Sequence, residues 1–137
     1  MYILDTNILS ELMRSAPNAQ VVEWLNAQSV DAIYTTAITV SEMQYGVQKM
    51  PAGVRKSNLI NAVDGLFNID FADHILPFDV QSAFIYAKIL TERELMGQPM
   101  SMADAQIAAI AISHHATLVT RNTKDFENID VLILNPF

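Results

Sequence analysis

The sequence predicts an α/β fold built on a five-stranded, mainly parallel sheet. Short runs rich in β-branched residues alternate with longer segments of helical periodicity, as in successive βα units. The short runs are apolar throughout, which is typical of strands that a parallel sheet buries on both faces. With 137 residues, of which 51% are hydrophobic, the chain is long enough for one core, and we expect residues 1–137 to form a single domain.

Five short apolar segments are the predicted strands. They lie at residues 2–4, 32–36, 75–78, 117–120 and 131–134. Because βα units bring the carboxyl ends of parallel strands to one edge of a sheet, polar residues that directly follow a strand are candidates for a ligand site.

Helical patterns fill the segments between these strands. They cover residues 18–28, 39–49, 54–67, 81–95 and 102–114, and a further helix starts at Thr6. The helix at residues 81–95 has clear ends, since Asp79 can cap its first turn and Gly97 follows its last. The helix at residues 102–114 is apolar nearly all round, which predicts that it is buried.

Composition excludes several classes of function. The chain has no cysteine, which rules out disulfides, a thiol nucleophile and a thiolate zinc site. A formal charge of −7 disfavours binding of nucleic acid by a broad basic surface, so metal ions or a basic partner would have to compensate. No segment approaches the roughly 20 apolar residues of a membrane span, and no basic leader precedes Asp5. We therefore expect a cytoplasmic protein without a membrane segment.

Two aspartates lie where a ligand site is expected. Asp5 directly follows the first strand, and Asp104 lies in the first turn of the buried helix. Each also has a structural interpretation, because Asp5 can cap the helix that starts at Thr6, and Ser101 with Asp104 has the spacing of a capping box. The positive end of the helix dipole would equally keep Asp104 ionised for a cation. The sequence leaves both interpretations open.

Two more carboxylates complete a candidate cluster. Glu42 falls between Ile38 and Gly46 on one helix face, which predicts an inward side chain, although a rotated helix would let it reach solvent. Asp125 follows the fourth strand closely, three residues after Asn122, where a capped turn is the structural alternative.

Together the four carboxylates predict a divalent metal site. Carboxylates a few ångströms apart repel one another and raise each other's pKa, a conflict that a divalent cation resolves. Hard oxygen ligands favour Mg²⁺, or Mn²⁺ in its place, and such ions bind substrate phosphates. The predicted chemistry is hydrolysis of a phosphodiester by a water that the metal activates.

Four motifs, spread along the whole chain, resemble those of the PIN-domain family, and in particular of VapC- and FitB-type toxin ribonucleases from type II toxin–antitoxin pairs. The motifs are LDTN at residues 4–7, SEMQYG at 41–46, ADAQIA at 103–108 and TRNTKDF at 120–126. The resemblance implies a three-layer α/β/α PIN-like fold and a metal-dependent endoribonuclease whose substrate is RNA, with transfer RNA as a candidate. It also implies a cognate antitoxin as partner and a homodimer or a larger assembly with that antitoxin.

By the same resemblance, Asp5, Glu42 and Asp104 are the core metal-binding and catalytic acids. The fourth position falls at Asn122 or Asp125, of which we take Asp125, with Asn122 assisting. Hydrogen bonds or phosphate contacts that position ligands, water and substrate are expected from Thr6, Asn7, Thr120, Arg121, Lys124 and Arg14.

Two other functions compete with the nuclease. A phosphatase with Asp5 as covalent nucleophile would want a second acid two residues later, where this chain has Asn7. The second alternative is a non-catalytic regulatory module whose acids dock a basic partner in an operator-binding complex. Metal-dependent turnover distinguishes this module from the nuclease.

Overall fold

The computed structural model describes all 137 residues and contains one five-stranded sheet. Its strands are β1 (Tyr2–Leu4), β2 (Ile33–Thr36), β3 (Ile75–Leu76), β4 (Thr117–Val119) and β5 (Leu132–Leu134). They lie in the order β3-β2-β1-β4-β5, and every neighbouring pair is parallel. This confirms the predicted parallel sheet and places the carboxyl ends of all strands at one edge.

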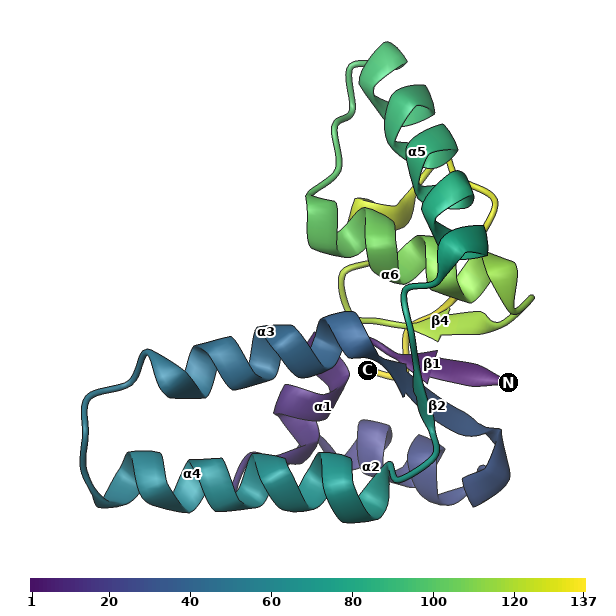
Figure 1. Cartoon of the computed structure of the whole chain (residues 1–137). Coiled ribbons are helices and arrows are strands. Elements are labelled where there is room, and N and C mark those ends of the chain that lie inside the picture. Colours follow the sequence, from purple (N-terminus) through teal and green to yellow (C-terminus); the bar gives the residue numbers. More distant parts are fainter.

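Helices cover both faces of this sheet, which confirms the three-layer α/β/α arrangement. They are α1 (Thr6–Leu12), α2 (Ala19–Asn26), α3 (Ala37–Gln48), α4 (Val54–Gly65), α5 (Val80–Leu95) and α6 (Met102–Ser113). In Figure 1, α5 and α6 lie on one side of the sheet and α1, α2 and α4 on the other, while α3 and α4 form an antiparallel pair that projects sideways.

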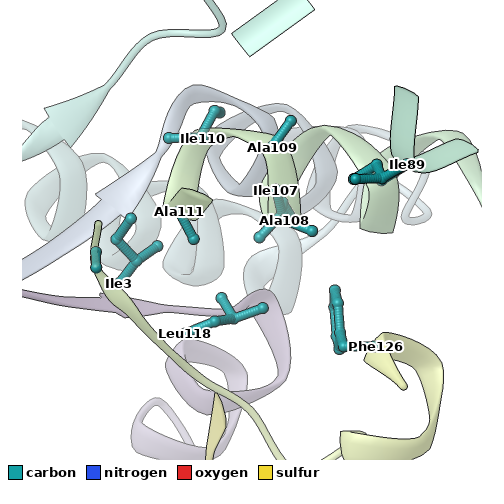
Figure 2. Close-up of a cluster of buried hydrophobic side chains, with 11 residues drawn as sticks. Ile3, Ile89, Ile107, Ala108, Ala109, Ile110, Ala111, Leu118 and Phe126 are labelled. Carbon is teal, nitrogen blue, oxygen red and sulfur yellow. The ribbon is translucent and has the colours of Figure 1, made fainter. Parts of the chain in front are cut away.

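The alternation of side chains along each strand creates two separate cores. Ile3 and Leu118 point to one face and pack with α5 and α6, whereas Leu4 and Val119 point to the other and pack with α1 to α4. Figure 2 shows the first core, in which alanines of α6 let the helix approach the strands closely. Burial on both sides explains why the strands are apolar throughout.

Several boundaries differ from those that the sequence predicts, each for a local reason. Helix α3 begins at Ala37 rather than residue 39, because Thr36 Oγ1 accepts a hydrogen bond from the Thr39 N–H and caps the helix. Strand β3 ends at Leu76 rather than residue 78, since Pro77 has no N–H for the ladder. A π-helix, Leu66–Asp70, carries the chain beyond α4. No helix is both long and apolar enough to cross a membrane.

Candidate active site

An open, polar cavity of about 600 Å³ lies at the carboxyl edge of the sheet. Residues from α1, α3 and α6 line it together with the segment after β4. Only one of its 11 lining residues is hydrophobic. The lining residues are Asp5, Thr6, Asn7, Ser10, Glu11, Arg14, Glu42, Asp104, Arg121, Asn122 and Phe137.

Asp5 is the most buried acid of this cavity, with 4% of its surface exposed. Its Oδ1 accepts a hydrogen bond from the Thr6 N–H at 2.8 Å, so Asp5 does cap α1 as the structural interpretation expects. Burial raises the pKa of Asp5 from 3.8 to about 6, the hydrogen bonds from Thr120 and Thr6 oppose the rise, and the charges of Asp104 and Glu42 add to it. Burial and the neighbouring carboxylates therefore destabilise the ionised form of Asp5, and a bound cation would stabilise it.

The second oxygen of Asp5 is held by side chains from two different elements. Its Oδ2 accepts from Thr120 Oγ1 at 2.8 Å and from Asn7 Nδ2 at 3.0 Å. Asn7 Nδ2 also donates to Thr120 Oγ1, and Asn7 Oδ1 accepts from the Arg121 N–H at 3.0 Å. The Asn122 N–H donates to Thr120 Oγ1 at 3.1 Å. This network fixes the Asp5 carboxylate and ties α1 to the end of β4.

Glu42 reaches the cavity from α3, but it is exposed, so the prediction of an inward side chain is wrong. The face of α3 that turns to the core is marked by the buried Met43 and Val47 instead. Thr6 Oγ1 donates to Glu42 Oε1 at 2.7 Å and lies 3.1 Å from Thr39 Oγ1. Glu42 is therefore oriented by α1, not by packing.

Asp104 enters the cavity from the first turn of α6. Ser101 Oγ accepts a hydrogen bond from the Asp104 N–H at 3.1 Å, which confirms the capping role of Ser101. The Asp104 side chain is half-buried, and burial is the main reason that its pKa is raised. The charges of Asp125 and Glu42 raise this pKa further, while Ser101 and Arg93 lower it.

The structure places Asn122 and Asp125 differently. Asn122 lines the cavity, whereas Asp125 and Lys124 are exposed and do not line it. Asp125 is nonetheless close enough to Asp104 for its charge to raise the pKa of Asp104. The capped turn expected here does not form through a side chain, because Asn122 makes no capping hydrogen bond.

A buried arginine fixes the segment that carries these two residues. Only 6% of the surface of Arg93 is exposed, and Arg93 Nε donates to the Gln98 carbonyl at 2.7 Å. Its guanidinium also donates to the carbonyls of Asp125 and Glu127, at 3.1 and 2.8 Å. The position of Asn122 and Asp125 at the edge of the cavity thus depends on α5.

Three lining residues were missed by the sequence analysis, namely Ser10, Glu11 and Phe137. Glu11 is buried, and both of its carboxylate oxygens accept from Arg14, at 3.2 and 3.1 Å. The available signal was its spacing of four residues from Asn7, which places both on one face of α1. Phe137 carried no such signal, since no periodic pattern reaches it.

The chemistry of the cavity fits a hard divalent cation. Its donors are carboxylate, hydroxyl and carboxamide oxygens, and four carboxylates outnumber two arginines. No three acidic or imidazole side chains lie close enough together to hold one ion directly. Mg²⁺ does not require such a cage, because it retains several waters and takes one or two carboxylates.

Comparison with known proteins identifies the family. The sequence matches the PIN domain over residues 2–132. Toxin FitB of Neisseria gonorrhoeae is 39% identical over 137 residues, covering 100% of this chain and 99% of that protein. VapC ribonuclease Y4jK of Sinorhizobium fredii is 36% identical over 137 residues, covering 100% and 98%. Among solved structures, a chain of FitAB bound to an IR36 DNA fragment is similar with a TM-score of 0.91 at 40% identity, covering 99% of this chain and 95% of that one. By sequence and by fold, therefore, this chain belongs to the PIN-domain family and is similar along its length to FitB and VapC proteins.

Proposed function

We propose that this chain is a metal-dependent endoribonuclease that acts as the toxin of a toxin–antitoxin pair. The observation that carries the proposal is the buried Asp5 carboxylate, which shares one open cavity with Glu42 and Asp104 at the carboxyl edge of the sheet. Two relatives that match the full chain are named a VapC ribonuclease and a toxin, in support of this activity. We place the reaction in the cytoplasm, where the cell's RNA is found.

Asp5, Glu42 and Asp104 would together hold Mg²⁺, or Mn²⁺ in its place, one or two of them directly and the rest through the ion's retained waters, with Asn122 or Asp125 at the fourth position. When bound, the ion lowers the pKa of a water molecule and offsets the negative charge that develops on the phosphate. Asp125 acts through its charge on Asp104, whereas Asn122 lines the cavity itself. Asn122 is therefore placed better for direct contact, and Asp125 for electrostatic support.

The remaining side chains of the site orient the acids and the substrate. Asn7 and Thr120 hold Asp5 Oδ2, and Thr6 holds Glu42 Oε1, so neither carboxylate is free to turn away from the cavity. Arg14 and Arg121 lie at the same cavity and offer guanidinium groups to the RNA phosphates. Arg14 is paired with Glu11 and Arg121 forms no salt bridge, so Arg121 is the arginine with an unpaired charge for a phosphate, while the bound metal would offset the remaining carboxylates.

The partner that fits this cavity is an antitoxin with a basic segment, because the lining is predominantly acidic. The similar chain of FitAB was solved on a DNA fragment, and we propose that this chain likewise assembles, as a dimer, with its antitoxin. Transfer RNA is the candidate substrate among cellular RNAs.

Cleavage of total cellular RNA by the purified, antitoxin-free protein tests the proposal. We expect discrete products with Mg²⁺ or Mn²⁺ and none with chelator, and end-mapping of the products would identify the RNA. Intact RNA in the presence of metal and folded protein would contradict the proposal and favour the regulatory binding module. Circular dichroism of the same preparation controls for folding.

A further inference from the structure

The aromatic ring of Phe137 is the one apolar group in an otherwise polar cavity. It is not fully buried, and the guanidinium carbon of Arg121 lies 4.7 Å from the centre of the ring, in a cation–π contact. An aromatic ring beside clustered acids has no part in holding a cation or in activating water. Phe137 packs in part against the core that contains Leu4 and Val119, which accounts for the buried part of the side chain, whereas the part of the ring that faces the cavity requires a separate explanation.

The backbone of Arg121 is attached to the framework of the site, and Phe137 is held by a local hydrogen bond. The Arg121 N–H donates to Asn7 Oδ1, and Asn7 in turn donates to Asp5 Oδ2. On the other side, the Phe137 N–H donates to Asn135 Oδ1 at 3.0 Å, just beyond β5. The pair therefore lies in the same cavity as Asp5, with the Arg121 backbone tied to the network that holds Asp5.

Arg121 differs from the other arginine of the cavity in its partner. Arg14 forms an ion pair with Glu11, whereas Arg121 forms no salt bridge although four carboxylates line the same cavity. Its side chain is exposed and lies over the Phe137 ring instead. The guanidinium thus has no carboxylate partner and remains available to a ligand.

A guanidinium that lies over an aromatic ring forms a surface that is suited to an unpaired nucleobase. Proteins that recognise single-stranded RNA stack the bases on aromatic rings or on guanidinium planes, and add cations for the backbone. Every base has a π-face, so such stacking selects for an unpaired nucleotide rather than for a sequence.

We propose that the Arg121–Phe137 pair is a nucleobase-binding subsite that stacks an unpaired base of the RNA next to the phosphate to be cleaved. This inference rests on the proposed ribonuclease function and adds to it a subsite, formed by Arg121 and Phe137, whose ligand is a nucleobase. Arg121 contributes both to the stack and to the charge that meets the neighbouring phosphate.

The test pairs a protein variant with a modified RNA. Phe137→Leu keeps an apolar side chain but removes the ring, and a matched RNA carries an abasic ribose at each position flanking the cut in turn. We expect Phe137→Leu to lower kcat/KM on normal RNA by about tenfold, mainly through KM, as for the loss of one stacked base. At one of these positions, the abasic RNA should lower kcat/KM of the wild type by the same factor. The same abasic RNA should not lower kcat/KM of Phe137→Leu any further. Phe84→Leu, on the exposed start of α5, is the control and should leave kcat/KM unchanged.

The proposal would be overturned if Phe137→Leu had the kcat/KM of the wild type. It would also be overturned if the loss from the variant and the loss from the abasic RNA multiplied when combined, because the ring and the base would then act independently. A second readout does not depend on cleavage. In Phe137→Trp, a short oligoribonucleotide should quench the added indole fluorescence, and its abasic counterpart should quench less; equal or absent quenching would overturn the subsite. The wild type, with Trp24 packed on Tyr2 and outside the cavity lining, gives the background. Absence of cleavage by the wild type, in contrast, would count against the proposed function, and the fluorescence result would still decide on the subsite.

Discussion

Replacing Asp5 by asparagine is expected to lower the rate of RNA cleavage by at least about 100-fold, because loss of a group that merely orients a metal ligand already lowers activity 10- to 100-fold. Asparagine keeps a side-chain oxygen for the Thr6 N–H and is as good a helix cap as aspartate. The substitution therefore removes the charge at the centre of the cavity and spares the start of α1. Initial rates at saturating Mg²⁺ measure the effect.

Glu94→Gln is the matched control for this prediction. Glu94 is an exposed acid of α5 outside the cavity lining, and its neutral variant should cleave at the wild-type rate. Thermal unfolding of both variants shows whether they are folded. An Asp5→Asn protein that is folded and cleaves within tenfold of the wild type would contradict a role for Asp5 in the reaction.

Without metal, the free energy of unfolding should fall by about 2 kcal/mol between about pH 4 and pH 6 on account of Asp5 alone, out of about 3 kcal/mol over its full titration. The pKa of Asp5 is about 6 in the folded protein and 3.8 as an ordinary carboxyl. Between these values the folded state binds more protons than the unfolded state, so stability decreases as the pH rises. Each pKa unit corresponds to about 1.4 kcal/mol. Asp104, whose pKa is also raised, acts in the same direction. Urea unfolding in chelator across this range measures the slope.

Divalent metal provides the control for this pH dependence. Saturating Mg²⁺ or Mn²⁺ should flatten the slope and raise the melting temperature at pH 7, because a ligand that binds only the folded state stabilises it. Asp104→Asn should melt in chelator at the same temperature as the wild type or higher, since Ser101 caps α6 through a main-chain N–H. The lowered pKa of the exposed Asp79 acts in the opposite direction, because its contribution to stability is lost as the pH falls, mainly below about pH 4. Stability in chelator that is constant or rises from pH 4 to pH 6 would contradict the electrostatics described for Asp5.

The features predicted well from sequence are those that local patterns determine. Runs of Ile, Leu and Val at residues 2–4 and 117–120 mark strands buried on both faces, and these strands pair as β1 and β4. The caps at Asp5 and Ser101 follow from spacing along one short segment. The carboxyl edge of the parallel sheet then brings Asp5 near the segment after β4, which contains Thr120 and Asn122.

The features that sequence could not supply depend on the rotation of helices and on long-range contacts. Glu42 is exposed because the rotation of α3 about its axis, which periodicity fixes only loosely, turns Met43 to the core. The different placement of Asn122 and Asp125 depends on bonds from Arg93, some 30 residues earlier in the chain. Phe137 reaches the cavity only because β5 lies beside β4. No pattern within one segment encodes such contacts.

Calorimetric titration of Mn²⁺ into the metal-free protein tests the central claim that the acids of the cavity, Asp5 and Asp104 among them, form a metal site. We expect Mn²⁺ to bind saturably to the wild type and to Glu94→Gln. Binding should be much weaker in both Asp5→Asn and Asp104→Asn. RNA cleavage by the wild type should rise over the same range of Mn²⁺ concentration. Equal binding by all four proteins, or no binding at millimolar Mn²⁺, would contradict the claim.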